Sequence, residues 1–574
     1  MKQPTPAIVA QSAVRRLPRL ALWLFCAAYV LPGLFGREPW KGNEFTAFGH
    51  MLALAEGTSS WLNPSVWGQE PALDALLPYW LGAWFIQMAP NWLNAGLAAR
   101  LPFALLLGLT MTTTWHAVYY LALSPQAQPV PFAFGGEAKP KDYARTIADG
   151  AVLALIACLG LALLSHEASP ILAQLALVSL SFYGVSALPY HPRYSLTALF
   201  IGLIGLCLSG APSFAVLMAV GSGILCLPDR HGTSFNTRIH HALILSVFGI
   251  AVALLAHLLG LWHWRLFPLH VIQEEWRDRS RLLAWFTWPT WPLVIWTLWR
   301  WRRQWTSTNW SRHLVVPLWF MVLTVSTAML TKSSQQTLLL SLPAMATLAA
   351  FALPTMRRSV TALIDWFALL FFSVCALVIW VVWIAMQTGW PAQPAANVAR
   401  LLPGFAPSFG WLAFVTASLA TAVWIWLVVW RTAKHRHALW KSMVLPAGGA
   451  ALCWLLLLTL WLPLLDFARS YKPWVTQIQG IMEKQSANEA KDVCLLSYGL
   501  DVGQMTAFHY HGGFKVQTVE QTPKPEQNQC PWLLVDNDLR PELGEVVRLN
   551  EWTRVRTIRR PSDNNEDVTL YHRR

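Results

Sequence analysis

The chain has 574 residues, of which 55% are apolar and only 13% charged, and its mean hydropathy is +0.39. Soluble domains carry roughly a quarter charged residues, so this composition excludes an ordinary soluble protein, a disordered chain and a disulfide-stapled secreted scaffold. The formal charge of +14 does not indicate nucleic-acid binding, because the Lys and Arg lie between apolar runs, where they orient membrane spans. The sequence therefore predicts a polytopic α-helical membrane protein in a lipid bilayer, with no nucleic-acid partner.

The first apolar run covers residues 20–36 and follows Arg15, Arg16 and Arg19. No small-residue cleavage site comes after it, so we expect a retained span and not a signal peptide. Further runs of a length that crosses a bilayer start near residues 98, 147, 171, 194, 212, 240, 283, 314, 337, 362, 410 and 443. We expect about thirteen transmembrane helices in a domain that covers residues 1–465.

An odd number of spans places the two ends of the chain on opposite sides of the membrane. In this arrangement the loops on the N-terminal side hold 20 of the 43 basic residues, and the opposite loops before residue 466 hold nine. The other 14 lie in the long C-terminal tail, which does not influence orientation. Because Lys and Arg are enriched in cytoplasmic loops, we expect a cytoplasmic N-terminus and a C-terminus outside the cytoplasm.

This topology requires the apolar stretch at residues 71–88 to lie at the membrane interface without spanning. Asp74 and Pro78 near its start, just after Glu70, favour that interpretation. The first outer loop then runs over residues 37–97, and loops of this length usually carry function. Acidic residues are rare in the chain but gather in this loop: Glu38, Glu44, Glu56, Glu70 and Asp74.

A second acidic position on the same side is the short turn that contains His166 and Glu167. A carboxylate beside an imidazole at a lipid boundary can bind a divalent metal, hold a phosphate-bearing ligand through that metal, or shuttle a proton. The alternative is a solvated turn without chemistry. We keep His166 and Glu167 as candidate metal ligands.

Residues 466–574 have a different composition from the rest of the chain. Short alternating or apolar runs at 493–498, 514–519, 532–535, 555–558 and 568–571, broken by Gly, Pro and Asn, predict four or five strands, and residues 474–483 predict a helix. We expect a small α/β domain outside the cytoplasm. Cys494 and Cys530 in this domain either form a disulfide or remain two buried thiols.

The first outer loop resembles a known family. The segments WKGNEFTAFGHM at 40–51, WLNP at 61–64, QEPAL at 69–73, PYWL at 78–81 and AARLP at 98–102 follow one another in the family's order and spacing. They resemble the first loop of the GT-C glycosyltransferases, and more narrowly the bacterial aminoarabinose transferases of lipid A and related protein O-mannosyltransferases. Lys332 followed by LPAMA at 342–346 is similar to a later stretch of the same family.

The resemblance implies a GT-C fold, a sugar donor linked to a polyprenyl phosphate, inversion at the anomeric carbon and no nucleotide cofactor. The family's catalytic Asp aligns with Asn43, which cannot accept a proton, so either Glu44 is the base or the chain is inactive or repurposed. The remaining candidates for substrate binding are Glu70, Asp74, Arg100, Arg277 and Lys332.

Several of these residues also have a purely structural interpretation. Glu44 could pair with Lys41 or Arg37, and Glu70 could cap the interfacial helix. Arg100 could anchor at headgroup depth, and Lys332 could simply end a span.

The sequence thus predicts a glycosyltransferase of the bacterial inner membrane with a periplasmic C-terminal domain. It would move a sugar from a polyprenyl-phosphate donor to an envelope acceptor, which is lipid A, another glycan or a protein. The alternatives are a transporter of lipid-linked sugars and a non-catalytic envelope assembly protein on the same fold. Transporters usually need charged groups near the bilayer midplane, and the predicted spans here are nearly free of acids.

Overall fold

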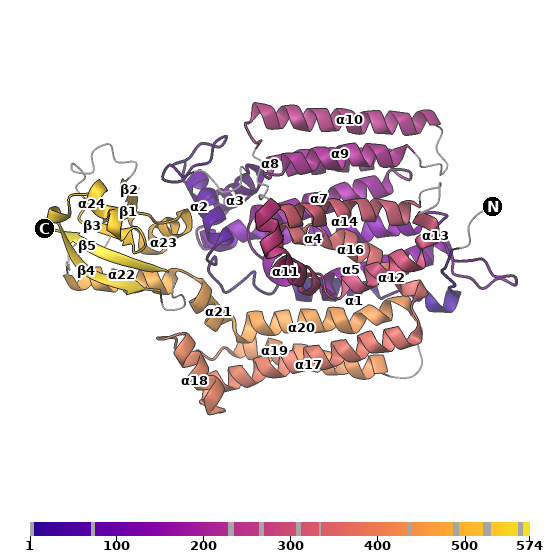
Figure 1. Cartoon of the computed structure of the whole chain (residues 1–574). Helices are drawn as coiled ribbons and strands as arrows, with labels where there is room; N and C mark the ends of the chain where they lie inside the picture. Colours follow the sequence, from indigo (N-terminus) through magenta and orange to yellow (C-terminus); the bar gives the residue numbers. More distant parts are fainter. Residues whose placement is uncertain are drawn as a thin grey trace.

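The computed structural model describes residues 5–69, 75–227, 235–262, 269–305, 311–331, 334–432, 438–485, 493–519, 530–560 and 566–574. They form an elongated molecule in which a bundle of long helices carries a small α/β domain at one end (Figure 1). The first described residues lie at the other end of the bundle, so the two termini are far apart. This separation agrees with an odd number of membrane crossings.

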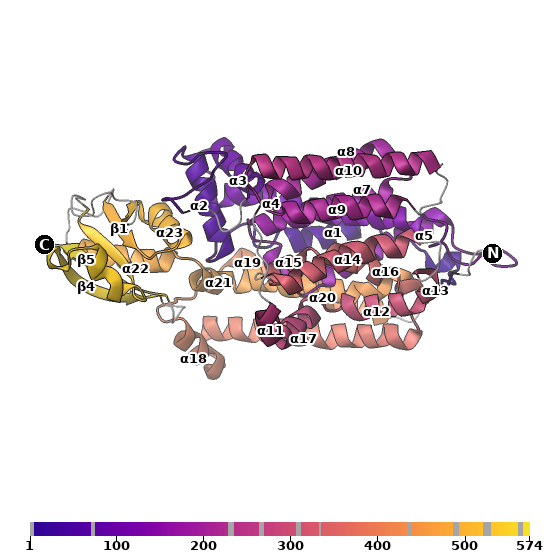
Figure 2. The same cartoon turned by 45° about the horizontal axis from the view of Figure 1, so that its top comes forward.

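The helices of the bundle run mostly along its long axis (Figures 1 and 2). Within the described chain, eight helical segments are long and apolar enough to cross a membrane, and α1, α8 and α9 are shorter apolar helices. The prediction of a polytopic helical membrane protein is therefore confirmed, while the number thirteen stays a prediction. The helices that lie at the predicted spans are α1 (Arg19–Val30), α4 (Ala95–Ala122), α5 (Pro140–Ala157), α7 (Pro170–Ala187), α8 (Pro192–Leu208), α9 (Pro212–Cys226), α10 (Phe235–Leu258), α11 (Leu269–Phe286), α12 (Thr290–Arg300), α14 (Arg312–Leu330), α15 (Ser334–Leu339), α16 (Leu342–Ala350), α17 (Arg358–Thr388), α19 (Trp411–Thr432) and α20 (Val444–Leu460).

Local sequence signals set the ends of these helices. Helices α5, α7, α8, α9 and α16 each have a proline in the first turn, where the missing N–H would have no partner in any case. Helix α17 ends at Gly389, whose φ of 76° places it in the left-handed region that glycine adopts without strain. The predicted span near residue 283 is instead divided between α11 and α12. Pro289 lies at this break, and proline disfavours helical geometry at the residue before it.

Two helices of the first outer loop, α2 (Asn43–Ala55) and α3 (Leu77–Met88), lie at the end of the bundle next to the α/β domain (Figure 1). Helix α3 has 12 residues, or about 18 Å at 1.5 Å per residue, which is well short of a bilayer core of about 30 Å. It packs closely on α2, because a Cβ at Gly82 would lie 2.2 Å from Met51 Sδ. Helix α1, which lies at a predicted span, has the same length, so the interfacial position of the 71–88 stretch stays a prediction.

The C-terminal domain contains a five-stranded sheet of order β2-β1-β3-β5-β4. Strand β1 is parallel to β2 and β3, and β5 is antiparallel to β3 and β4. A disulfide joins Cys494 to Cys530, with their Cα atoms 4.9 Å apart, so the first of the two sequence alternatives is present. The predicted small α/β domain is confirmed. Its elements are α22 (Lys472–Gln485), β1 (Cys494–Tyr498), α23 (Val502–Gly512), β2 (Lys515–Thr518), β3 (Trp532–Asp536), α24 (Leu543–Val546), β4 (Trp552–Arg559) and β5 (Asp567–Arg573).

Helix α23 of this domain packs against α2 of the first loop (Figure 1). Asp501 caps its N-terminus and accepts a hydrogen bond from Gln504 N at 2.7 Å. Gly49 allows close approach, since a Cβ there would lie 2.2 Å from Thr506 Oγ1. At the edge of this contact His509 pairs with Glu56 at 3.1 Å. Helix α2 of the first outer loop thus contacts the sheet domain directly. Short helices complete the chain: α6 (Leu161–Leu164), α13 (Arg302–Trp305), α18 (Ala392–Leu401) and α21 (Leu462–Arg469).

Candidate functional site

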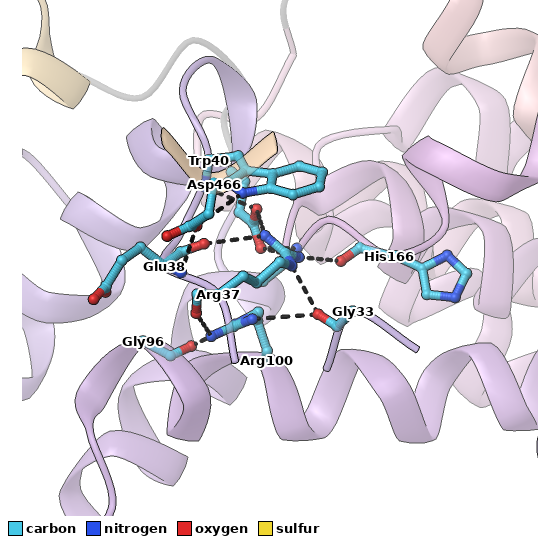
Figure 3. A network of polar contacts seen from close by, with 10 residues as sticks. Gly33, Arg37, Glu38, Trp40, Gly96, Arg100, His166 and Asp466 are labelled. Carbon is cyan, nitrogen blue, oxygen red and sulfur yellow. Dashed lines mark hydrogen bonds and ion pairs between the residues drawn. The ribbon is translucent and has the colours of Figure 1, made fainter. Parts of the chain in front are cut away.

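A buried ion pair between Arg37 and Glu44 forms the centre of a polar network where the bundle meets the C-terminal domain (Figure 3). The contact is bidentate, with Arg37 Nη1 2.5 Å from Glu44 Oε2 and Nη2 2.9 Å from Oε1. The two side chains are only 2% and 1% exposed. The sequence allowed Glu44 to pair with Lys41 or with Arg37, and in the structure its partner is Arg37.

The Glu44 carboxylate also accepts backbone hydrogen bonds. Trp40 N donates to it at 3.0 Å and Ala168 N, from the turn before α7, at 3.4 Å. Burial alone would raise the pKa of Glu44, but the charge and hydrogen bonds of Arg37 outweigh burial and lower that pKa below its usual value. A buried carboxylate held in its ionised form stabilises the loop and is poorly placed to accept a proton from a ligand.

Arg100 lies beside this pair and is buried as well, at 4% exposed. Its guanidinium donates to three carbonyl oxygens, of Gly96 at 2.9 Å, Gly33 at 3.3 Å and Arg37 at 2.6 Å (Figure 3). Gly33 makes this turn possible, because its φ is +81° and a Cβ there would lie 2.5 Å from Leu458 Cδ1. Arg100 therefore holds the turn after α1, with its donors already occupied by protein oxygens.

Trp40 and Asp466 connect the network to α21. Asp466 Oδ1 accepts hydrogen bonds from Glu38 N at 2.9 Å and from the Trp40 indole N–H at 3.2 Å. Burial raises the pKa of Asp466. Glu38 in turn pairs with Lys472 at 3.1 Å, at the start of α22. The first outer loop is thus tied to the segment that leads into the C-terminal domain.

His166 uses both of its ring nitrogens within the protein. Nδ1 donates to Ala162 O at 2.5 Å, and Nε2 accepts from the Trp454 indole at 3.1 Å and lies 2.8 Å from Tyr29 O. Burial lowers the pKa of His166 to about 4, so the ring is neutral near pH 7. Neither nitrogen is directed toward Glu167 as a metal ligand would be. In the part of the chain that the structure describes, no group of three or more His, Cys, Asp or Glu side chains is placed to hold a metal. The divalent metal stays a prediction without support from this geometry.

Glu167 follows His166 in the turn between α6 and α7 and is partly exposed. Its carboxyl makes no hydrogen bond or ion pair with any described residue. Burial and the Glu44 carboxylate together raise the pKa of Glu167 to about 7, although the charges of Arg469 and Arg37 act to lower it. Glu167 is thus a carboxyl without a partner among the described residues that ionises near neutral pH, which fits the proton shuttle that the sequence gave as one alternative to a metal ligand.

Arg469, at the last position of α21, is a residue that sequence reasoning missed. Its guanidinium carbon lies 5.2 Å from the centre of the Trp40 ring, and Arg37 lies over the same ring at 4.5 Å. The side chain is half-buried. A basic residue directly after the last apolar run, on the side where basic residues are few, was the available signal.

The remaining predicted residues are dispersed. Asn43 is exposed at the first position of α2, and Arg277 is exposed on α11. Glu70, Asp74 and Lys332 lie outside the described residues. The structure thus brings Glu44, Arg100, His166 and Glu167 together and leaves the other assignments as predictions.

An apolar cavity of about 410 Å³ adjoins His166 within the bundle. Its walls come from α1, the α5–α6 connection, α6, α17 and α20. Three of its lining residues, Tyr29, Ala162 and Trp454, are the ones that contact the His166 ring. A space for a hydrocarbon group therefore lies directly next to the turn that carries Glu167.

Comparisons with known proteins identify the fold. No protein-family model matches the chain, and no curated protein matches its sequence. Two solved structures match in three dimensions, ArnT from Cupriavidus metallidurans bound to undecaprenyl phosphate and the same protein in the apo state. Each match covers 96% of this chain and 96% of ArnT at 14% identity, with TM-scores of 0.57 and 0.59. The resemblance to the GT-C glycosyltransferases is therefore confirmed for the fold.

We predict that Glu44→Gln destabilises the protein. The substitution leaves the Arg37 guanidinium buried without a counter-ion, which costs about 3–5 kcal/mol in comparable cases. The midpoint of thermal unfolding in detergent should fall clearly below that of the wild type. Glu56→Gln, which breaks a half-exposed pair with His509, is the control and should change it little. An unchanged midpoint together with complete loss of sugar transfer would instead identify Glu44 as the base.

Proposed function

We propose that the protein transfers a glycosyl group from a polyprenyl-phosphate donor to an envelope acceptor, on the periplasmic face of the bacterial inner membrane. The observation that carries the proposal is that Glu167, a carboxyl that ionises near pH 7, follows His166, whose ring contacts residues that line an apolar cavity. The fold shared with ArnT, which has been solved with undecaprenyl phosphate bound, supports the class of donor.

In this mechanism Glu167 is the general base. The acceptor hydroxyl attacks the anomeric carbon while Glu167 takes its proton, and the bond between that carbon and the phosphate oxygen breaks. The electron pair of that bond leaves with the polyprenyl phosphate, and the configuration at carbon inverts. A base is most effective when its pKa lies near the working pH, which is the condition that burial and the Glu44 charge create for Glu167.

The cavity next to His166 suits the isoprenoid part of the donor. It lies among apolar helices and is lined by Leu159, Phe371, Val378 and other apolar side chains. Each buried CH₂ group contributes about 0.8 kcal/mol, so even part of an isoprenoid chain would bind there with useful affinity. A tail in this cavity would have its polar end close to the turn that carries Glu167.

Two observations support the assignment of sides. The disulfide between Cys494 and Cys530 is typical of an oxidising compartment such as the periplasm. The C-terminal domain and the first described residues lie at opposite ends of the bundle (Figure 1). Both fit a periplasmic C-terminus and a cytoplasmic N-terminus.

Asn43 favours a second candidate, a non-catalytic envelope assembly protein. In the family that the first loop resembles, an Asp stands at this position. The Asn side-chain amide cannot accept a proton as an Asp carboxylate does. Under this alternative the protein would bind a polyprenyl phosphate without releasing any sugar.

The first prediction from this proposal concerns the reaction itself. When the purified protein is supplied with a labelled polyprenyl-phosphate sugar and an envelope lipid extract, it should release polyprenyl phosphate. Glu167→Gln should reduce the rate roughly 10²- to 10⁴-fold, the usual contribution of a general base. Because only the ionised carboxyl accepts a proton, the wild-type rate should rise with pH and level off above about pH 7. Glu56→Gln serves as the control for loss of a carboxyl. Absence of release by the wild type would favour the assembly protein.

The second prediction concerns the cavity. Ala450→Trp should fill part of it and raise the KM for a long-chain donor roughly tenfold, since the loss of two buried CH₂ groups costs about 1.6 kcal/mol. A short-chain donor that does not reach the cavity should react as with the wild type. Leu412→Trp, on an exposed face of α19, is the matched control. Equal effects on both donors would place the tail elsewhere.

The third prediction tests the assignment of sides. A reporter fused after Arg574 should be active only when located outside the cytoplasm, whereas one inserted at Gly135, in an exposed loop at the far end of the bundle, should report the cytoplasm. Two fusions on the same side would contradict an odd number of spans.

A further inference from the structure

The Arg469 side chain differs from the other arginines of the network. Arg37, Arg100 and Arg560 all spend their N–H groups on carboxylates or carbonyl oxygens. The Arg469 side chain, in contrast, stacks on Trp40 and makes no hydrogen bond or ion pair within the described ranges. Its five N–H donors, half-buried, are therefore available to an anion.

The backbone around Arg469 is held in place from three sides. Lys41 N donates to Arg469 O at 2.8 Å, and Ser470 N donates to Asp466 O at 2.8 Å. Arg560, which is paired with Glu566, donates to Ala468 O at 2.8 Å. A guanidinium that is stacked on an indole and carried by a fixed backbone loses little conformational freedom when it binds a ligand.

Glu167 is the nearby group of opposite charge. The Arg469 charge is close enough to lower the pKa of Glu167, yet the two side chains form no ion pair within the 4.0 Å that defines one. Other pairs in this region, such as Arg37 with Glu44 and Arg560 with Glu566, are in direct contact. Arg469 and Glu167 thus influence each other electrostatically, while the Arg469 guanidinium has the Trp40 ring as its contact.

We propose that the Arg469 guanidinium binds the phosphate of the lipid-linked donor, opposite Glu167. The planar guanidinium can hold two phosphate oxygens at once and remains charged at any accessible pH. This inference rests on the proposed function, because the phosphate becomes the leaving group when the anomeric C–O bond breaks. The N–H groups of Arg469 then meet the negative charge that develops on the departing phosphate, while Glu167 holds the proton of the acceptor hydroxyl.

This assignment differs from the cations that the sequence suggested. Arg100 has its donors occupied by carbonyl oxygens, so a phosphate would first have to displace them. Arg277 is exposed on α11, where nothing in the described contacts directs it toward Glu167. Arg469 instead stacks on Trp40, and its N–H groups have no partner among the described residues.

Binding of undecaprenyl phosphate to the full-length protein in detergent tests the proposal, with undecaprenol as the probe that lacks the phosphate. Arg469→Ala should weaken binding of undecaprenyl phosphate roughly ten- to a hundredfold and leave undecaprenol unchanged. Arg469→Lys should recover part of the loss. Arg400→Ala, an exposed arginine on α18, should bind both probes like the wild type. Equal phosphate binding by the wild type and Arg469→Ala would overturn the proposal.

A second readout separates positioning from general loss of structure. Arg469 lowers the pKa of Glu167, so Arg469→Gln should raise that pKa and move the acidic limb of the rate profile to higher pH, at an unchanged midpoint of unfolding. If the acidic limb stays in place, Arg469 does not act beside Glu167.

A wild type that binds undecaprenyl phosphate through Arg469 but never turns over would refute glycosyl transfer and preserve this site. Normal turnover by Arg469→Ala would refute only the site.

Discussion

The architecture at this end of the molecule depends on the buried ion pair between Arg37 and Glu44. Withdrawal of two charges from water costs several kcal/mol per ion, and contact between them compensates only when the remaining donors and acceptors are satisfied. Here they are, because Glu44 also accepts from the backbone N–H groups of Trp40 and Ala168, and Arg37 also donates to Gly33 and His166. The pair therefore requires the turn after α1, the start of α2 and the turn before α7 to converge.

The charges brought together at this point also set the pKa values of Glu44 and Glu167. Glu44 keeps its charge because Arg37 faces it, and the retained negative charge, added to burial, disfavours ionisation of Glu167. Two carboxyls in one region thus have pKa values shifted in opposite directions, a pattern that separates a structural anion from a group able to exchange protons near pH 7. Arg469 and Arg37 limit the upward shift of Glu167, so the tuning of this carboxyl depends on the same arginines that organise the loop.

Sequence alone predicted the features that depend on local pattern. Apolar runs predicted the helices and short alternating or apolar runs predicted the strands, while the resemblance of the first-loop segments to a known family implied the GT-C fold. The roles of individual charged residues were less accessible, because burial and partner choice arise from contacts between distant segments. Arg100 reaches Gly33 and Arg37, and Arg469 stacks on Trp40 across more than 400 positions of sequence. No local pattern distinguishes an arginine that holds a turn from one that is free to bind a ligand.

The different orientations of Asn43 and Glu44 on α2 explain why the proposed general base lies on another element. Consecutive residues of an α-helix point about 100° apart, so an exposed Asn43 and a buried Glu44 are two consequences of one orientation of α2. That orientation is fixed by the close contact of Gly49 with Thr506 and by the burial of Phe45 and Met51. Glu44 cannot occupy the place of a carboxylate at position 43 unless α2 rotates and loses these contacts. Under the proposed function, a catalytic carboxyl compatible with this packing stands outside α2, and Glu167, which is partly exposed and whose carboxyl has no partner among the described residues, meets that condition.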